Sequence, residues 1–373
     1  MKRATRILAA LLCVLLLLPT VVFAEAQPSL EKQIAQSAEG MSALGGKKGE
    51  LLKDRELFPA GDSVCDWLAI AMALSGTRES YSDYLAELKA HVEDAYAKNG
   101  CLDRNKATEY HRISLTVLAL GGNPTNFGTK PDGSAIDLIA EGTYNYARDP
   151  GAQGLNGWIW ALLTLDAGDT EVPADALYSR EDMVNAISVA QEPDGGFGLI
   201  PGKSDVDITA MAVQALAPYR DQMETEIDAA LSYLSGQLTD TCGYIAYGDE
   251  NAESTAQVIL ALCALGIDPE TDSRFVKGEH TLLTELSQFR EADGTYCHVL
   301  EGAGDGLATA QSVLALALQR VRSGQPWVLH FDGTQAPREA FGTNGIIICA
   351  VIGAVVVIAA GAIYIIGRKR KKA

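Results

Sequence analysis

The chain has 373 residues, of which 47% are hydrophobic, and its 30 Lys and Arg against 48 Asp and Glu give a formal net charge of −18. A chain of this length can bury a sizeable core. Its negative charge repels phosphate backbones, so we expect no nucleic-acid partner.

Both ends of the chain carry an apolar segment. Basic residues, a Leu-rich core and a small-residue site follow one another at the start, so residues 1–26 are predicted to be a secretory signal peptide. Residues 345–367 are apolar throughout and lead into the basic tail 368–373. About 20 apolar residues span a bilayer, and a basic flank marks the cytoplasmic side. The sequence therefore predicts a single-pass protein of the cell membrane with an extracellular domain.

Between these ends, amphipathic helices alternate with helices that are apolar nearly all round, which is typical of surface and buried helices respectively. The predicted outer helices are 30–44, 81–97, 135–147, 182–191, 226–234 and 280–289. The predicted inner helices are 66–74, 113–120, 158–165, 209–217, 255–265 and 309–321. No strand competes, so residues 27–321 are predicted to form an all-α domain. Residues 322–344 lack any period and are predicted to be a stalk.

The inner helices carry a repeat whose clearest copy is the stretch 205–216. Its aligned copies give a column at spacings of 46, 45, 51, 46 and 54 residues, made of Cys65, His111, Asn156, Asp207, Glu253 and Leu307. A period in this range is typical of repeat architectures. An open solenoid would need polar capping repeats, which neither end has. We therefore expect a closed ring, an (α/α)6 toroid of six inner and six outer helices.

The loops before the inner helices share a Gln…Gly-x-aromatic pattern. It occurs at Gln191 with Gly195-Gly196-Phe197, at Gln237 with Gly243-Tyr244, and at Gln288 with Gly294-Thr295-Tyr296. The pattern resembles the repeat of squalene cyclases and protein prenyltransferases, over roughly residues 30–320. This resemblance implies the same (α/α)6 toroid. In physical terms, the glycines permit a tight turn and the aromatic ring fills the space between repeats.

One segment of the repeat resembles a catalytic motif. Asp205-Val206-Asp207-Ile208-Thr209-Ala210 is similar to the Asp-x-Asp-Asp-Thr-Ala motif of class II terpene cyclases. The resemblance implies that Asp207 is the acid that protonates an alkene or epoxide. Ile208 stands where those enzymes carry a second Asp.

Two cofactors follow from further resemblances. Asp240-Thr241-Cys242 resembles the zinc-binding Asp-x-Cys of prenyltransferases, but their zinc His falls on Ala308, which leaves His298 as a substitute. Residues 207–212 are similar to a segment of cobalamin carriers, which implies a corrinoid, although those carriers add a β-rich domain that this chain lacks. Cys242 and Cys297 occupy corresponding loops, so a disulfide or a metal site there is a further alternative.

A closed ring would bring the polar column together at one end of the barrel, the mouth. The candidate ligand-binding residues are Cys65, Trp67, His111, Asn156, Trp158, Asp205, Asp207 and Glu253. Convergent polar groups with apolar walls are the usual mark of a ligand site. Simpler roles compete: Asp205, Asn251 and Asp305 suit N-caps, and Trp158 suits packing.

The favoured function is a surface-anchored toroid that binds a small molecule, a lipid or an extracellular protein at its acidic mouth. The first alternative is a terpene cyclase or prenyltransferase-like enzyme with Asp207 as acid, which needs a deep, dry, aromatic cavity. The second is a glycan-processing (α/α)6 enzyme with Asp207 and Glu253 as acid and base, which needs an open groove between facing carboxylates.

Overall fold

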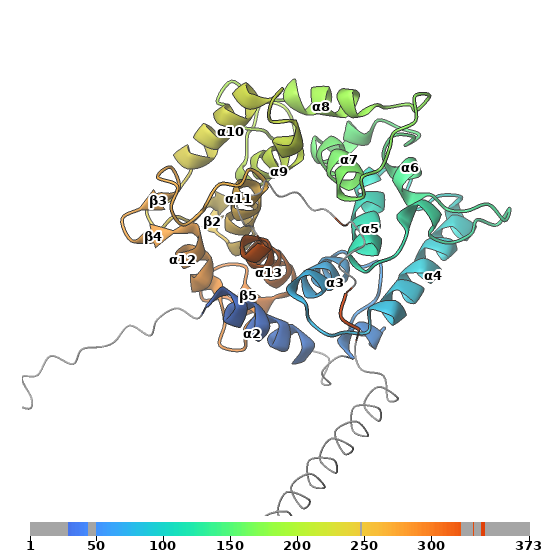
Figure 1. Ribbon diagram of the computed structural model, residues 1–373, viewed down its shortest axis with the longest axis horizontal. Helices are drawn as coiled ribbons and strands as arrows, with labels where there is room; N and C mark the ends of the chain where they lie inside the picture. The colour runs from blue at the N-terminus through green and yellow to red at the C-terminus, as the bar shows by residue number, and fades with distance from the viewer. Residues whose placement is uncertain (1–28, 44–49, 247, 322–330, 332–336, 340–373) are drawn as a thin grey trace, which may run out of the picture.

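The computed structural model describes residues 29–43, 50–246, 248–321, 331 and 337–339. Within these residues, twelve α-helices form two concentric rings (Figure 1). The predicted signal peptide, apolar segment 345–367 and basic tail lie outside the described residues. In the part that is described, no helix combines the length and the apolar character needed to cross a membrane.

Six helices line the centre of the ring. They are α3 (Ser63–Ser75), α5 (Ala107–Ala119), α7 (Asn156–Ala167), α9 (Val206–Leu216), α11 (Ala252–Ala264) and α13 (Gly306–Val321). Each packs against the next in chain order, and α13 packs against α3, so the ring is closed. This confirms the predicted toroid. The inner helices are rich in fully buried Ala, Leu, Ile and Val because they are covered on nearly every side.

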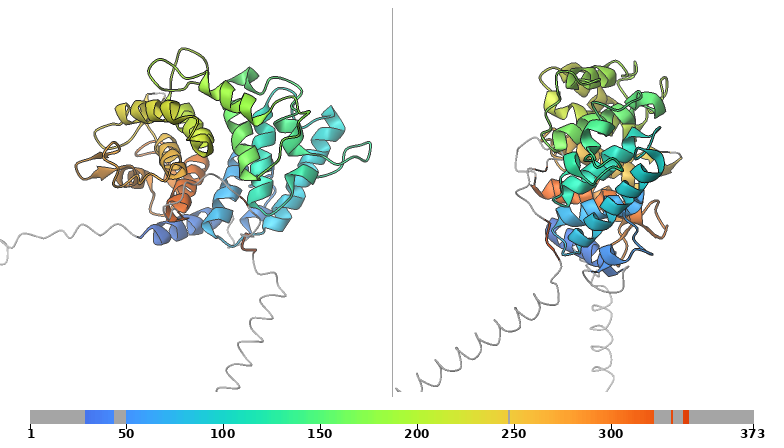
Figure 2. Two further views of the ribbon diagram at one scale, coloured as in Figure 1. Left: turned by 45° about the horizontal axis from the view of Figure 1, so that its top comes forward. Right: turned by 90° about the vertical axis from the view of Figure 1, so that its right-hand side faces the viewer.

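Six more helices coat this barrel. They are α2 (Leu30–Ala43), α4 (Tyr81–Asn99), α6 (Leu138–Gly142), α8 (Arg180–Ser188), α10 (Glu224–Gly236) and α12 (Leu282–Leu286), the last extended by a 3-10 turn, Ser287–Phe289. Figure 2 shows the coat from two further sides, with the inner helices enclosed by it. Each outer helix buries one apolar stripe, as in α4, where Tyr84, Leu88 and Val92 are buried at helical spacing.

Neighbouring inner helices begin at the same end of the barrel. Leu155 at the start of α7 donates its N–H to Leu199 O in the loop before α9, at 3.1 Å. Ala252 at the start of α11 likewise donates to His298 O in the loop before α13, at 3.1 Å. The end where the inner helices begin is the predicted mouth.

Short hairpins connect the outer and inner helices of the second half. Three two-residue antiparallel pairs are present, β1 (Ile245–Ala246) with β2 (Asp249–Glu250), β3 (Val276–Lys277) with β4 (His280–Thr281), and β5 (Tyr296–Cys297) with β6 (Gly304–Asp305). They are a small departure from the strand-free prediction, because two-residue pairs leave no periodic trace in a sequence.

The predicted Gly-x-aromatic role is confirmed in these loops. Phe197, Tyr244 and Tyr296 are each fully buried between repeats. Gly195 has a φ of +87°, and a Cβ there would approach Ala229 O of α10 to 2.7 Å. Only glycine permits both the left-handed turn and this close approach.

Two of the predicted outer helices are shorter than expected. Residues 135–147 were predicted as one helix, but α6 spans only five residues. Asp137 caps it by accepting from Ala140 N at 2.9 Å, while Ile136 pairs with Phe127 through a backbone hydrogen bond of 2.9 Å. The helix α12 likewise covers only half of the predicted span 280–289, because β4 and a capping Thr281 occupy its start.

The described residues of the predicted stalk contact the ring. Phe331 N donates to Ala167 O at the end of α7. Glu339 accepts from Ser82 N through its carboxylate at 2.8 Å, and from Arg78 through its carbonyl at 3.2 Å. These contacts lie where inner helices end, on the face opposite the mouth.

Candidate functional site

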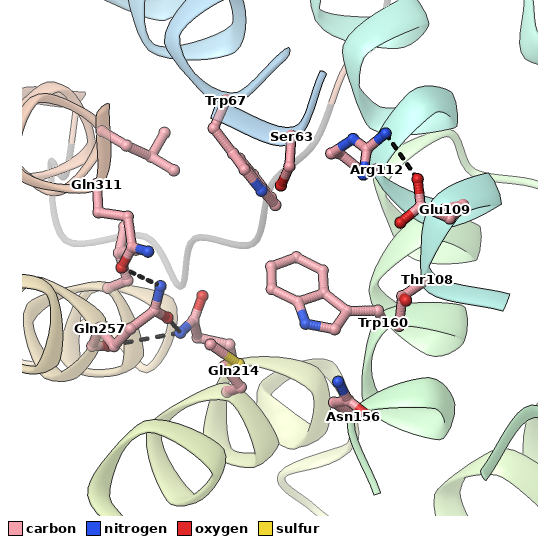
Figure 3. Close-up of a pocket in the computed structure, with 13 residues that line it drawn as sticks. Ser63, Trp67, Thr108, Glu109, Arg112, Asn156, Trp160, Gln214, Gln257 and Gln311 are labelled. Carbon is pink, nitrogen blue, oxygen red and sulfur yellow. Dashed lines mark hydrogen bonds and ion pairs between the residues drawn. The ribbon is translucent and has the colours of Figure 1, made fainter. Parts of the chain in front are cut away.

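A cavity of about 220 Å³ lies at the centre of the ring, and all six inner helices contribute to its lining (Figure 3). The first three helices supply Ser63, Trp67, Thr108, Glu109, Arg112, Asn156 and Trp160. The last three supply Met211, Gln214, Gln257, Leu260, Gln311 and Leu314. On each helix the lining residues are three or four positions apart, because that spacing returns to the same face of a helix.

Two tryptophans form the aromatic part of the lining. Trp67 of α3 and Trp160 of α7 have ring centroids 5.3 Å apart and an interplanar angle of 57°. The helices α3 and α7 are separated in the ring by α5, and the two side chains point toward one another inside the ring (Figure 3). The faces of the two rings can bind an apolar ligand or stabilise a positive charge inside the cavity.

Three glutamines form a ladder along the lining of the second half. Gln214 Nε2 donates to Gln257 Oε1 at 2.9 Å, and Gln257 Nε2 donates to Gln311 Oε1 at 3.0 Å. The ladder links α9, α11 and α13. Each glutamine is a polar residue within an otherwise apolar stretch of inner helix. A polar residue at such a position is the signal in the sequence that could have identified the ladder.

Arg112 is held on the α5 side of the cavity by a buried ionic cluster. Its Nε donates to Asp66 Oδ2 at 2.9 Å, and its Nη2 pairs with Glu109 Oε2 at 2.8 Å. Asp66 also accepts from Tyr84 OH at 2.7 Å and from Gly61 N at 3.1 Å. Burial alone would lower the pKa of Arg112, but the two carboxylates raise it above its ordinary value, so the guanidinium stays charged. The sequence prediction missed this cluster.

Asp207 lies one helical turn nearer the mouth than Met211, which lines the cavity. Burial raises the pKa of Asp207 above its ordinary value, Ser254 opposes that rise, and the nearby Asp205 charge adds to it. Its Oδ1 is buried without a hydrogen-bond partner, and Ser254 Oγ lacks one too. Because burial is the largest of these effects, the surroundings shift Asp207 towards the neutral carboxylic acid.

Glu253 occupies the equivalent position on α11, one turn above Gln257. His298 Nδ1 lies 2.8 Å and 3.0 Å from its two carboxylate oxygens. The Glu253 side chain is 15% exposed and the His298 side chain 59% exposed, so the pair connects the buried mouth with solvent. Burial raises the pKa of Glu253, and the hydrogen bond from His298 opposes this rise.

The structure separates the predicted site residues into four groups. Trp67 and Asn156 line the cavity. Asp207 and Glu253 lie just above it. Asp205 caps α9 by accepting from Ile208 N at 2.8 Å, which is the N-cap role that the sequence predicted as the simpler alternative.

His111, Cys65 and Trp158 do not line the cavity, which corrects their predicted place at the mouth. His111 is buried with Nε2 2.7 Å from Gly142 O of α6, and burial lowers its pKa to about 4. Cys65 is buried, with its N–H capped by Asp62. Trp158 packs edge-on against Tyr178 with centroids 5.1 Å apart.

The physical reason for the first two errors is an alignment slip. On α7, the cavity face carries Asn156 and Trp160, and the same spacing occurs in the lining of α3 and α5, at Ser63 with Trp67 and at Thr108 with Arg112. The predicted column was therefore two residues late on α3 and three residues late on α5. Two residues turn a helix by about 200°, so Cys65 faces away from the centre. Three residues turn it by about 300°, so His111 is rotated by about 60° from Thr108, and it contacts Gly142 of α6.

The candidate zinc ligands are not brought together. Asp240 is exposed beside Lys277 Nζ at 3.7 Å, Cys242 is buried with its thiol donating to His280 O, and His298 pairs with Glu253. The described residues contain no group of three or more His, Cys, Asp or Glu side chains placed to hold a metal. The residues therefore do not fit the zinc site of the prenyltransferase resemblance.

The alternative of a disulfide between the two corresponding loops finds no support in the structure. Cys242 and Cys297 are both free thiols. Cys242 instead holds a turn with a φ of +67°, at the place where the flanking repeats have Gly195 and Gly294.

Comparisons with known proteins place this ring beside terpenoid enzymes. No protein-family model matches the chain. It is similar to drimenyl diphosphate synthase of Streptomyces showdoensis, with 24% identity over 302 residues that cover 77% of this chain and 56% of that protein. The chain thus spans about half the length of the curated relative that it matches. This similarity supports the resemblance to terpenoid cyclases.

Among solved structures, the chain is similar to Candida albicans protein geranylgeranyltransferase-I complexed with GGPP. The TM-score is 0.49 and the identity is 10%, over 76% of this chain and 90% of that one.

Proposed function

We propose that the ring binds an isoprenoid chain in its central cavity and that Asp207 protonates a carbon–carbon double bond of that chain. The observation that carries this proposal is the position of Asp207, a half-buried carboxyl group whose pKa is raised by burial, one turn above a tryptophan-lined cavity. An acid for this task must be protonated at working pH, and burial favours that state.

The chemistry needs no further reactant. The proton of Asp207 adds to one alkene carbon and leaves a cation on its neighbour, which a second double bond attacks to close a ring. Loss of a proton from the last cation restores the balance, so the product is an isomer of the substrate. Trp67 and Trp160 stabilise the passing positive charge through their π faces.

The pair of Glu253 and His298 is suited to returning a proton to the mouth after each turnover. His298 is the exposed member and contacts both oxygens of Glu253, whose neighbour in the chain, Ser254, lies beside Asp207.

Binding without catalysis is the second candidate, and Ile208 in place of the second Asp of the cyclase motif favours it. It uses the same cavity and keeps the small-molecule or lipid ligand of the sequence prediction. A corrinoid is less suited, because about 220 Å³ is below the usual range even for drug-sized ligands. A protein ligand and a place at the cell surface stay predictions.

The glycan-processing alternative has less support. A glycosidase needs one carboxylic acid and one ionised carboxylate flanking the bond that breaks. Here burial raises the pKa of both Asp207 and Glu253, and neither residue lines the cavity.

The test compares the full-length protein with its Asp207→Asn variant in reactions with acyclic isoprenoids, with mass spectrometry of the products. We expect a cyclic isomer from the wild type and at least a hundredfold lower rate from Asp207→Asn. Asp62→Asn is the matched control, because Asp62 caps α3 and Asn caps a helix as well as Asp does. Its rate should stay close to that of the wild type.

The rate should also fall as the pH rises through the pKa of Asp207. The acid must carry its proton, and its pKa is raised above the ordinary value of about 4. Cyclic product from Asp207→Asn at the wild-type rate would contradict the proposed role. Ligand binding without any product would leave the non-catalytic candidate.

A further inference from the structure

The charges around the cavity restrict what it can hold. Of the described residues that line it, only Glu109 and Arg112 carry a charge at neutral pH. They pair with each other at 2.8 Å, and Arg112 also pairs with Asp66 at 2.9 Å. One guanidinium is thus set against two carboxylates. Even with Asp66 protonated, Glu109 alone would balance Arg112, so the cluster has no positive charge to spare for an anion.

The mouth is no better suited to an anion. Asp205, Asp207, Glu253 and Asp305 surround it, with His298 as the nearby basic group. The N-termini of α3, α9, α11 and α13 could bind an anion through free N–H groups. At each of these starts a capping side chain already accepts from at least one N–H group, and three of the four caps are acidic residues that disfavour an anion: Asp62, Asp205, Asn251 and Asp305.

The starts of α5 and α7 have no side-chain cap. At α7, the N–H groups of Gly157 and Trp158 donate to backbone carbonyls, at 3.1 Å each, whereas the start of α5 carries a cation. Its N-cap, Lys106, is an exposed cation without a side-chain cap of its own. The N–H of Lys106 donates to Asp103 Oδ1 at 2.9 Å, which places a carboxylate beside this cation as well. Among the starts of the six inner helices, this is the one with a cation at the N-cap, so it is the first place to test for a diphosphate.

Neutral hydrogen-bonding groups, by contrast, do face the cavity. The glutamine ladder uses the amide of Gln214 and the carbonyl of Gln311, so it leaves Gln214 Oε1 as an open acceptor and Gln311 Nε2 as an open donor. Reversing all three amides would exchange these two ends and still leave one of each. Asn156 adds a side-chain amide that makes no hydrogen bond within the described residues.

We propose that the ligand of this cavity is an uncharged isoprenoid that carries a hydroxyl or carbonyl oxygen, rather than a prenyl diphosphate. The hydrocarbon chain lies against Trp67, Trp160 and the apolar side chains, and the oxygen pairs with an open end of the glutamine ladder. A buried polar group that stays unpaired is costly, so the open amides disfavour a pure hydrocarbon. A diphosphate is disfavoured because no buried cation is free to neutralise it. That the chain is an isoprenoid rests on the proposed function.

The experiment is a titration of tryptophan fluorescence in the full-length protein, since two tryptophans line the cavity. The probes are geraniol and farnesol, their diphosphates, and acyclic terpene hydrocarbons of the same lengths. We expect the alcohols to bind at least tenfold more tightly than either the diphosphates or the hydrocarbons. Gln214→Leu and Gln311→Leu should each remove most of the preference for alcohol over hydrocarbon. Gln237→Leu, on an exposed position outside the cavity, is the control and should keep it.

Separate outcomes decide the two proposals. Diphosphates that bind as tightly as the alcohols, and lose this affinity in Lys106→Gln, would overturn the inference and leave the proposed function intact. Tight binding of alcohols without a cyclic product would sustain the inference and overturn only the catalytic role of Asp207. Binding of none of the probes would overturn both. The Asp207→Asn variant should bind the alcohols like the wild type, because Asp207 does not line the cavity.

Discussion

The two halves of the ring are built differently. In the half formed by α9, α11 and α13, each helix begins at an Asp or Asn that caps the N–H three residues later, at Asp205, Asn251 and Asp305. A buried aromatic residue precedes each of these caps. In the half formed by α3, α5 and α7, only α3 has such a cap, at Asp62, which accepts from Cys65 N. Lys106 and Leu155 make no side-chain cap at all.

The first half is held instead by groups that have no counterpart in the second. Asp66 and Arg112 form a buried ion pair between α3 and α5, and His111 is buried against α6. The second half joins its inner helices with neutral glutamines. The inner helices of this ring are thus joined in two ways, by hydrogen bonds between neutral amides in the second half and by a buried ion pair in the first.

The ionic cluster offers the largest expected effect. Replacing Arg112 by Met leaves Asp66, which is fully buried, without its cation. Breaking a buried pair in this way typically destabilises a protein by about 3–5 kcal/mol. The matched change in the other half is Gln257→Met, which removes only neutral hydrogen bonds of about 1 kcal/mol each. Urea unfolding of the two variants compares the halves directly. Equal losses of stability would show that the two halves do not differ in this respect.

The buried His111 predicts a pH effect that belongs to the first half. Burial lowers its pKa to about 4 in the folded protein, against an ordinary value of 6.5. Below pH 6.5 the unfolded chain binds a proton that the folded chain does not, so stability falls as the pH falls, until about pH 4. Over that window the loss amounts to about 3 kcal/mol.

A His111→Gln variant tests this assignment by unfolding at several pH values. Gln keeps an amide that can pair with Gly142 O but does not titrate, so the loss between pH 6.5 and pH 4 should shrink by that amount. The exposed His280 serves as control, and His280→Gln should leave the pH dependence unchanged. An unchanged slope in His111→Gln would show that other groups cause the acid sensitivity.

The difference between the two halves of the ring also explains which features could be predicted from the sequence. All twelve helices, their alternation and the closure of the ring followed from hydrophobic periodicity and the repeat. Where the repeat kept its caps and aromatics, the column through Asp207 and Glu253 was aligned correctly, one turn above Met211 and Gln257. The Gly-x-aromatic loop is absent before α3, and both the loop and the cap are absent before α5, so Cys65 and His111 were assigned to the wrong face.

Other features depend on contacts that a linear pattern does not contain. Arg112 reads as a solvated charge at the start of an amphipathic helix until Asp66, 46 residues earlier, is placed beside it. The early end of α6 depends on close packing, because a Cβ on Gly142 would collide with the side chain of Tyr110. The carbonyl oxygen of the same Gly142 accepts a hydrogen bond from His111 Nε2 at 2.7 Å.

The smallest expected effect concerns a threonine that ties the aromatic loop to its helix in the second half. Phe197 N donates to Thr209 Oγ1 at 2.8 Å, and both residues are fully buried. A Thr209→Val variant keeps the shape but leaves this N–H without a partner, which costs about 1–3 kcal/mol. In the first half, Thr116 Oγ1 is equally buried but only donates to Arg112 O at 2.9 Å, a carbonyl within its own helix.

Thr116→Val should therefore cost less than Thr209→Val, because no buried N–H loses its acceptor. Thr309 repeats the Thr209 contact, accepting from Tyr296 N at 2.9 Å, so Thr309→Val should match Thr209→Val within a few tenths of a kcal/mol. Thr255 completes the comparison inside the second half: its hydroxyl bonds Asn251 O at 3.3 Å and accepts nothing from Tyr244 N. If unfolding in urea ranks Thr255 with Thr116, the stabilising element is the hydroxyl-to-aromatic-loop bond itself. If it ranks Thr255 with Thr209, position in the regular half of the ring decides the effect, and the hydrogen bond does not.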